Sequence, residues 1–424
     1  MGNMKRREFL ICGMAAAASP FLSSSLQAQQ KTIKIGALYP LTGNLASTGL
    51  DCKRGVEMAV EIINGKYDLN LPLAKTEGLP NLGGAKLELV FADTKGEPKN
   101  GQAEAERLVT QDKVVGAIGA YQSAVTKTAS QATERLKIPY VCSDSSSPTL
   151  TERDFKYFFR VSPHDGTFAH DQFSFLEDLK KQKKQEVKTV ALLYENTEFG
   201  SNVGKEEQKY AQQYGYKVVA DISYAANATD VTSEVGRLIK ANPDVLMHAS
   251  YITDAILFTK SFKEMGFNPK GMITMAGYLE PGYLPAVKTD GNYVIIRSTF
   301  ALDLAKSKPL VAKVNEIYKK KFGIDMSENA ARSFTAPFVL ADAINRAKTS
   351  DAEAVVKALR ETDIPGDQVL YPWKGVKFDP KSQQNIYATG TLVQVQDQQY
   401  VTVWPFEAAA KEVIWPFPAW KSRK

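Results

Sequence analysis

The chain has 424 residues, of which 44% are hydrophobic and 24% charged, and its formal net charge is +6. This length exceeds what one ordinary hydrophobic core holds, so two domains are expected. Basic residues are scattered among acidic ones, so no nucleic-acid partner is expected, and no apolar run after residue 28 is long enough to cross a bilayer.

The first 28 residues are typical of an export signal. The basic stretch Lys5–Arg7 precedes an apolar, Ala-rich run that Pro20 interrupts, and Ala28 is the small residue at the expected cleavage point. The paired arginines followed by Phe9–Leu10 indicate a twin-arginine signal. The mature protein is therefore expected in the periplasm or another extracytoplasmic space.

Three cysteines bear on anchoring and on cross-linking. Cys12 is not expected to be a lipid anchor, because Ile11 stands where a small residue should precede a lipidated cysteine. Cys52 and Cys142 remain after cleavage, and export permits a disulfide between them, but two separately buried thiols are the favoured interpretation.

From Lys31 to Cys142, short apolar runs alternate with helical patterns. In the first helix, Val56, Ala59, Val60 and Ile63 recur at spacings of three and four, which gives one apolar face. Strands that alternate with helices favour a parallel, doubly wound sheet. The expected strands are 33–39, 86–92, 114–120 and 138–142, and the expected helices are 51–64, 101–111 and 123–137, with a surface loop over 66–84.

The same alternation restarts after Pro163, which indicates a second lobe. Its expected strands are 188–194, 217–224, 244–250 and 271–276, with helices up to Lys184 and over 202–214, 231–241 and 254–265. Beyond Arg297 come helical patterns over 309–322, 330–348 and 353–360, a short run over 375–379 and a strand over 391–396. These elements are too few for a third domain and are assigned partly to the first lobe.

The usual signatures of catalysis and cofactor binding are missing from the sequence. There is no HExxH, GxSxG, SxxK, GxGxxG or phosphate-loop motif, which argues against an enzyme and against a bound cofactor. His164, His170 and His248 have no spacing of four residues between any two of them, so no helical metal site is expected.

The loops that leave the carboxyl ends of the predicted strands are rich in hydroxyl and aromatic groups. Open α/β sheets bind ligands at these ends, and serine hydroxyls and helix N-termini suit a carboxylate. Single loops of this kind are more often ordinary caps and turns, but three in one lobe favour a site. The candidate residues are Tyr39, Tyr121, Gln122, Ser123, Asp144, Ser145 and Ser146 in the first lobe, and Phe199, Tyr251, Gly277 and Glu280 in the second.

Several short segments occur along the chain in an order typical of one protein family. They are the segments 35–43, 138–141, 149–151, 159–161, 194–195 and 199–200, the Asp93 loop, and Trp404-Pro405. In these segments, and over nearly all of the mature chain, the sequence resembles the periplasmic solute-binding proteins of branched-chain amino-acid ABC transporters, of the leucine/isoleucine/valine type.

This resemblance implies a type I periplasmic binding protein fold, in which two doubly wound lobes joined by three crossovers close on a ligand by a hinge. The crossovers are expected near Pro163, Ser298 and Ile386. The resemblance also implies a monomer without a cofactor that delivers its solute to an ABC permease in the inner membrane. The implied divisions are residues 1–28 for the signal peptide, 31–163 plus 299–386 for the first lobe, and 164–298 plus 387–424 for the second.

In similar proteins, the ligand carboxylate is held at the position of Ser123 and by loop amides near Ser145 and Ser146. The Ser146 hydroxyl and the Asp144 carbonyl match groups that help hold the ammonium. Tyr251 matches a tyrosine in the cleft of the second lobe.

Two departures from the family pattern leave the ligand open. Gly277 stands where an acidic residue commonly pairs with the ammonium, so Glu280 or Asp144 would have to supply that charge. Phe199 stands where a tyrosine is frequent, which makes the cleft more apolar. The expected ligand is therefore a branched-chain or aromatic amino acid, an aromatic or aliphatic carboxylate, or an amide.

Two other functions are weighed against transport. The same clamp could serve a membrane receptor as a ligand-sensing protein, which crosslinking to a sensor kinase would reveal. An exported enzyme is the weakest alternative, because the chain carries no cofactor motif.

Overall fold

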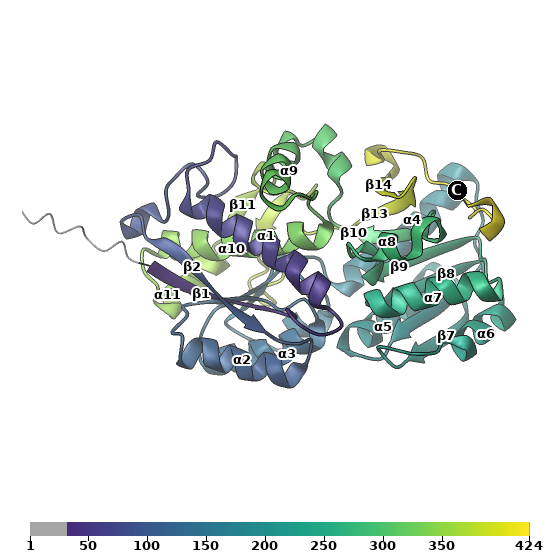
Figure 1. Cartoon of the computed structure of the whole chain (residues 1–424), viewed down its shortest axis with the longest axis horizontal. Helices are drawn as coiled ribbons and strands as arrows, with labels where there is room; N and C mark the ends of the chain where they lie inside the picture. The colour runs from purple at the N-terminus through teal and green to yellow at the C-terminus, as the bar shows by residue number, and fades with distance from the viewer. Residues whose placement is uncertain (1–31, 424) are drawn as a thin grey trace, which may run out of the picture. The chain divides into compact units, whose positions relative to one another are not determined.

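The computed structural model describes residues 32–423 (Figure 1). The predicted signal peptide and its cleavage site near Ala28 lie outside the described residues. Within residues 32–423, the strands form sheets of five, seven and two strands. None of the helices in this range combines the length and hydropathy needed to cross a membrane.

The five-stranded sheet is parallel throughout and has the order β2-β1-β3-β4-β5. In β1, Ile33 and Ile35 belong to one hydrophobic core and Leu38 to another, because side chains alternate across a strand. Helices α1 and α10 cover one face of this sheet and α2 and α3 the other (Figure 1). We call this sheet and its helices lobe 1. Its elements up to the first crossover are β1 (Thr32–Tyr39), α1 (Ala46–Asn64), β2 (Lys86–Asp93), α2 (Pro98–Thr110), β3 (Ala117–Gly119), α3 (Ser123–Arg135), β4 (Tyr140–Cys142) and β5 (Phe158–Arg160).

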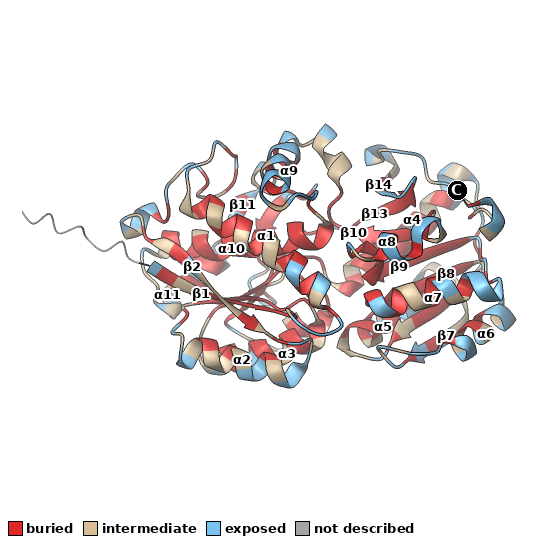
Figure 2. Ribbon diagram, viewed as in Figure 1, coloured by how far each residue is buried: buried red, intermediate tan, exposed pale blue. Residues whose placement is uncertain are grey.

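The seven-stranded sheet, with its helices, forms lobe 2 and has the order β14-β13-β10-β9-β8-β6-β7. Helix α4 packs against α5, and α7 packs against α6 and α8. Buried residues fill the central strands of both sheets, the edge strands β2 and β7 are largely intermediate or exposed, and exposed residues lie on the outer sides of the helices (Figure 2). The elements up to the second crossover are α4 (Asp165–Lys183), β6 (Thr189–Glu195), α5 (Glu198–Tyr214), β7 (Lys217–Tyr224), α6 (Thr232–Ala241), β8 (Val245–Ser250), α7 (Ile252–Met265), β9 (Gly271–Ala276), α8 (Tyr283–Val287) and β10 (Ile295–Ser298).

The C-terminal elements contact both sheets, since α10 packs against β3 and β4, and β13 pairs with β10. A Cβ on Gly55 would lie 2.1 Å from the carbonyl oxygen of Ala330, so this glycine lets α1 approach α10 closely. The domain boundaries and the third crossover, expected near Ile386, remain predictions. The elements are α9 (Pro309–Phe322), α10 (Glu328–Ala347), α11 (Ala352–Arg360), β11 (Asp363–Pro365), β12 (Gly375–Lys377), β13 (Thr391–Gln396) and β14 (Gln399–Trp404).

The sheet of lobe 2 departs from the parallel arrangement at one edge. Strands β13 and β14 form an antiparallel hairpin, and β13 also pairs antiparallel with β10. The hairpin turns at Asp397 and Gln398, both of which have a positive φ, as two-residue hairpin turns require. This turn carries no glycine, and the sequence pattern did not predict β14.

Candidate functional site

A pocket lies between the two lobes. Six of the eleven predicted site residues line it. These are Tyr121, Ser123, Asp144 and Ser146 from lobe 1, and Phe199 and Tyr251 from lobe 2. The other lining residues are Ala276, Arg297, Asn329 and Arg332.

Ser123 is the first residue of α3 and lines the pocket. Its Oγ accepts a hydrogen bond from the backbone N–H of Ser147 at 3.2 Å, which leaves the hydroxyl proton free to donate. Ser145 instead holds the loop, since its hydroxyl donates to the carbonyl of Tyr121 at 2.9 Å. Gln122 does not line the pocket, and its Nε2 donates to the carbonyl of Gly96 at 3.2 Å. The loop over 143–147 leads into a 3-10 helix over Pro148–Thr151.

Asp144 is buried and does not point to solvent. Its carboxylate accepts hydrogen bonds from the hydroxyls of Tyr39 at 3.2 Å, Ser143 at 3.0 Å and Ser333 at 2.8 Å. Burial raises the pKa of Asp144, while the charge of Arg332 and these hydrogen bonds act against the rise. Tyr39 does not line the pocket, but it holds the carboxylate of Asp144, which does.

Gly277 follows β9 and packs against the start of α7. A Cβ at this position would lie 2.3 Å from the carbonyl carbon of Tyr251 and 2.5 Å from the backbone nitrogen of Ile252. This backbone therefore leaves no room for the acidic side chain that similar proteins carry there.

Glu280 is fully buried and reaches across to lobe 1. Its Oε1 accepts a hydrogen bond of 2.8 Å from the hydroxyl of Tyr121, and its Oε2 accepts one from Thr48 Oγ1. Burial raises the pKa of Glu280 to about 8. Glu280 does not line the pocket, but it contacts Tyr121, which does, and its bonds to Tyr121 and Thr48 join the two lobes.

A second bridge between the lobes involves Glu198 at the start of α5. Its carboxylate accepts hydrogen bonds from Thr149 Oγ1 at 2.6 Å and from Lys127 Nζ at 2.9 Å, both in lobe 1. Both bridges connect lobe 1 to lobe 2.

Aromatic rings form the apolar part of the pocket wall. The ring of Tyr251 lies 5.9 Å from that of Tyr121 and 5.5 Å from that of Phe199. Both separations are within the range of favourable aromatic pairs, so the three rings hold one another in place.

Arg297 is the main site residue that the sequence interpretation missed. It lies in β10, is only 3% exposed, and stacks over the ring of Phe168 at 4.3 Å. Its Nε and Nη1 have no hydrogen-bond partner, and neither has Nδ2 of the buried Asn329. Glu328 Oε1 lies 3.5 Å from Arg297 Nη1 and 3.7 Å from Arg332 Nη1. The available signal was an arginine directly after the apolar residues 294–296, because a charged side chain is rarely buried unless it is paired.

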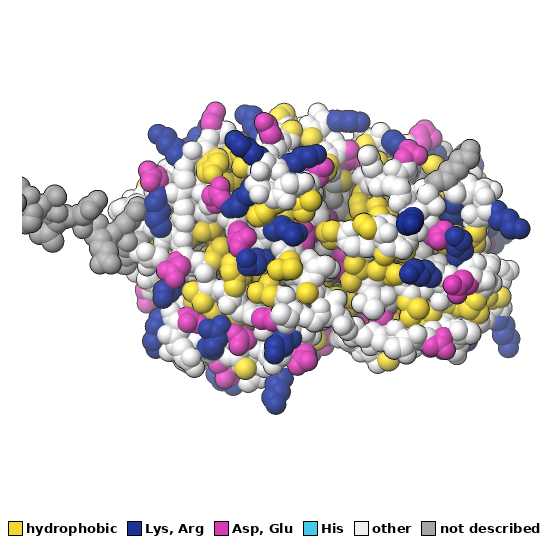
Figure 3. Space-filling model, in the orientation of Figure 1, with side chains coloured by type: hydrophobic (Ala, Val, Ile, Leu, Met, Phe, Trp, Pro, Cys, Tyr) yellow, Lys and Arg dark blue, Asp and Glu magenta, His cyan; other side chains and the backbone are white. Residues whose placement is uncertain are grey.

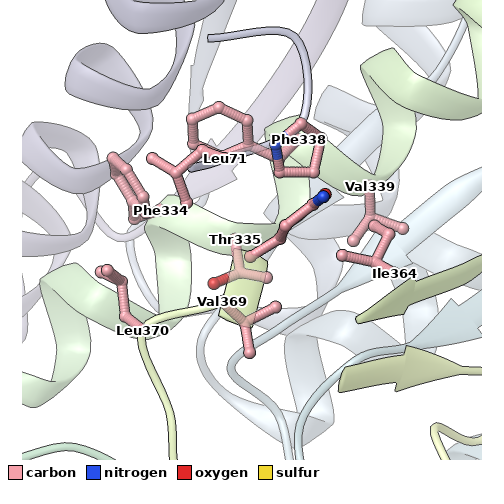
Figure 4. Close-up of a pocket in the computed structure, with 10 residues that line it drawn as sticks. Leu71, Phe334, Thr335, Phe338, Val339, Ile364, Val369 and Leu370 are labelled. Atoms are coloured by element: carbon pink, nitrogen blue, oxygen red, sulfur yellow. The ribbon is translucent and has the colours of Figure 1, made fainter. Parts of the chain in front are cut away.

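A second pocket lies within lobe 1 (Figure 4). Phe334, Phe338 and Val339 of α10 face it, with Leu71 from the segment predicted as a surface loop. None of the predicted site residues lines this largely apolar pocket.

The histidines and cysteines form no reactive site among the described residues. His248 is buried against Tyr224 and Tyr278, and burial lowers its pKa to about 3. Cys52 and Cys142 are both buried and free, in agreement with the favoured interpretation. No group of three or more histidine, cysteine or acidic side chains within residues 32–423 is arranged to hold a metal ion.

The sequence model of the family described as "Periplasmic binding protein" matches residues 32–399. The Leu/Ile/Val-binding protein homolog 7 of Brucella suis biovar 1 (strain 1330) is 30% identical over 397 residues, which cover 91% of this chain and 94% of that protein. Homolog 8 of the same organism is also 30% identical, over 402 residues, with the same coverage.

Solved structures share the fold. The leucine-binding protein LivK from Thermotoga maritima MSB8 has a TM-score of 0.75 and 21% identity, and the match covers 87% of this chain and 97% of that one. LivJ from Streptococcus pneumoniae, in complex with isoleucine, has a TM-score of 0.72 and 20% identity, with coverage of 91% and 100%. A solute-binding protein from Rhodopseudomonas palustris BisB5, in complex with 3,4-dihydroxy benzoic acid, has a TM-score of 0.69 and 18% identity, with coverage of 87% and 95%.

Proposed function

Because the chain belongs to the periplasmic binding protein family, we propose that it is the solute-binding component of an ABC importer. It captures a small amino acid or a related carboxylate in the interlobe cleft and delivers it to a permease in the inner membrane. The family resemblance and the two-lobed type I fold expected from the sequence are confirmed. The family consists of binding proteins and not of enzymes, and it implies an extracytoplasmic location.

The single observation that carries this proposal is the pocket between the lobes, which both lobes line with polar and aromatic side chains. Small-molecule sites are concave, largely apolar and equipped with a few convergent polar groups. The direct ligand contacts in this proposal are Tyr121, Ser123, Asp144, Ser146, Phe199 and Tyr251. Tyr39, Gln122, Ser145, Gly277 and Glu280 act through these residues or through lobe closure.

Transport by a single hinged molecule also supports a monomer as the working form. On the face shown in Figure 3, basic and acidic side chains are interspersed, so this face offers no patch of purely positive charge for nucleic acid.

The interlobe bonds of Glu198 and Glu280 form only when the lobes are closed, and a permease that contacts both lobes at once would recognise that state.

A thermal-shift screen tests the proposal. The chain lacking residues 1–28 is unfolded in denaturant to remove carried-over solute, refolded, and mixed with leucine, phenylalanine, their deaminated acids, aliphatic and aromatic dicarboxylates and small amides. At least one compound should raise the melting temperature in proportion to ln(1 + [L]/Kd) and be recovered chemically unchanged. A shift with the amino acids but not the deaminated acids would show that the ammonium is bound. A compound consumed on incubation, or a panel without any shift, would contradict the proposal.

A further inference from the structure

The pocket holds buried hydrogen-bond donors that nothing in the protein satisfies. Nε and Nη1 of Arg297 and Nδ2 of Asn329 have no hydrogen-bond partner, although Arg297 is 3% and Asn329 4% exposed, and both residues line the pocket. The one contact of Nη1 is an ion pair of 3.5 Å with Glu328 Oε1, which does not meet hydrogen-bond geometry. Polar groups this deeply buried are almost always paired, so unpaired donors in a pocket wall indicate a missing acceptor.

The neighbouring carboxylates do not supply that acceptor. Glu328 is the one acidic residue in the described chain that forms an ion pair with Arg297, at 3.5 Å, and it is shared with Arg332 and with the hydroxyl of Thr299 at 3.1 Å. Asp144 is occupied by three hydroxyl groups, and burial raises its pKa. Asp165, whose pKa burial raises to about 6, forms no ion pair with Arg297.

The same wall contains the N-terminus of a long helix. Helix α10 begins at Glu328 and runs for 20 residues, with Ser327 as its N-cap, so Asn329 lies in its first turn. The positive end of the helix dipole therefore adds to the charge of Arg297 and favours an anion at this wall.

The unpaired donors of Arg297 and Asn329 are distinct from the donors at Ser123, where the carboxylate of an amino acid is expected to bind. Ser123 lies at the start of α3, whereas Arg297 and Asn329 belong to β10 and α10. An α-ammonium group cannot accept a hydrogen bond, so a branched-chain amino acid with its carboxylate at Ser123 would leave the donors of Arg297 and Asn329 unpaired. A carboxylate is a strong acceptor for the charged N–H donors of a guanidinium.

We propose that the ligand carries a second acidic group, which Arg297 and Asn329 bind, so that this protein selects dicarboxylates over monocarboxylates. The inference rests on the function proposed above and narrows its ligand class. Arg297 provides the charge and two donors, Asn329 provides a third donor, and the aromatic rings pack against the part of the ligand between its two acids.

Isothermal titration with matched acid and amide pairs tests the inference on the refolded mature protein. The probes are glutarate against glutaramate, L-glutamate against L-glutamine, and isophthalate against 3-carbamoylbenzoate, and each pair differs only in whether the second group is charged. In at least one pair the dicarboxylate should bind at least tenfold more tightly.

An Asn329→Asp variant tests whether this subsite makes the distinction. An acid in the first turn of a helix favours the helix, so the variant should fold, yet it replaces a donor with a like charge. It should weaken dicarboxylate binding at least tenfold and binding of the amide less than threefold. Asn100→Asp, the same change in the first turn of α2, should leave both affinities unchanged.

The outcomes distinguish failure of the second acidic subsite from failure of the solute-binding function. If monocarboxylates or amides bind as tightly as every dicarboxylate, or if Asn329→Asp weakens both members of a pair equally, the second acidic subsite is wrong and the solute-binding function stands. If none of these compounds and none of the amino acids binds, both proposals are wrong.

Discussion

The hydroxyl of Tyr121, at the end of β3 in lobe 1, donates a hydrogen bond of 2.8 Å to Oε1 of Glu280, beyond β9 in lobe 2. Tyr121 also lines the pocket, so this bond links the ligand wall directly to lobe closure. Ligand contacts that order the ring of Tyr121 therefore also favour the closed arrangement of the lobes.

Replacing Tyr121 by phenylalanine should weaken binding without unfolding the protein. The change leaves Oε1 of Glu280 without its donor in the closed state, which costs about 1–3 kcal/mol for a buried group. Titration with the solute found in the screen should show roughly tenfold weaker binding and faster dissociation. Tyr318→Phe is the matched control, because the buried hydroxyl of Tyr318 has no partner, and its removal should leave affinity unchanged. Equal affinities for all three proteins would refute the coupling.

Glu280 should make stability depend on pH. Its pKa rises from its ordinary value of 4.5 to about 8 on burial, so between these two pH values the folded state holds a proton that the unfolded state has lost. The free energy of unfolding therefore falls as pH rises from 4.5 to 8, by on the order of 3 kcal/mol from this group.

Urea unfolding of Glu280→Gln at pH 5 and pH 8 measures this contribution, because glutamine resembles the protonated acid and does not titrate. The variant should lose less stability than the wild type over this interval. Glu412→Gln, whose carboxylate is 86% exposed, should behave like the wild type. An identical pH dependence for Glu280→Gln and the wild type would contradict a protonated Glu280.

Gly277 should tolerate no side chain. A Cβ would meet the backbone of Tyr251 and Ile252 at 2.5 Å or less, so Gly277→Ala should reduce the free energy of unfolding by about 1–3 kcal/mol and weaken binding by displacing Tyr251. Gly236→Ala is the control, because no atom lies within 4 Å of its added Cβ, and alanine in α6 should stabilise the protein by about 0.5–1 kcal/mol. Urea melts of both variants test this contrast, and a Gly277→Ala protein as stable as the wild type would mean that the loop can shift.

The two thiols of the mature chain should be unreactive in the native protein. Cys52 and Cys142 are buried and free, and burial raises the pKa of both thiols, so little thiolate is present. A thiol reagent should titrate no cysteine under native conditions and both in denaturant without reductant. Failure to detect them in denaturant would indicate a disulfide.

The sequence predicts the parts of the fold that periodicity encodes. The helix over 309–322 and the strands over 217–224 and 271–276 agree with the structure to the residue. Strand β3 is shorter than predicted, because only Ala117–Gly119 pair with β1 and only Ala117 and Ile118 pair with β4. Strands β10 and β14 were not predicted, because four residues interrupted by Arg297 and a hairpin turn without glycine give weak local signals.

The contrast between local sequence patterns and long-range packing also explains which site residues could be predicted. Ser123, Asp144 and Tyr251 follow strands and could be predicted, since the carboxyl ends of parallel strands meet at one edge. Arg297 and Asn329 reach the pocket only because β10 and α10 are brought there by long-range packing, which no local pattern reports.

The most direct test of the central claim, that the interlobe pocket binds the solute, is titration of the double variant Ser146→Ala/Tyr251→Ala with the solute that gives the largest thermal shift. Both residues line the pocket from opposite lobes, so the variant should lose measurable binding while it keeps the circular dichroism spectrum and cooperative melting of the wild type. A folded double variant that binds with unchanged affinity would show that the ligand lies elsewhere.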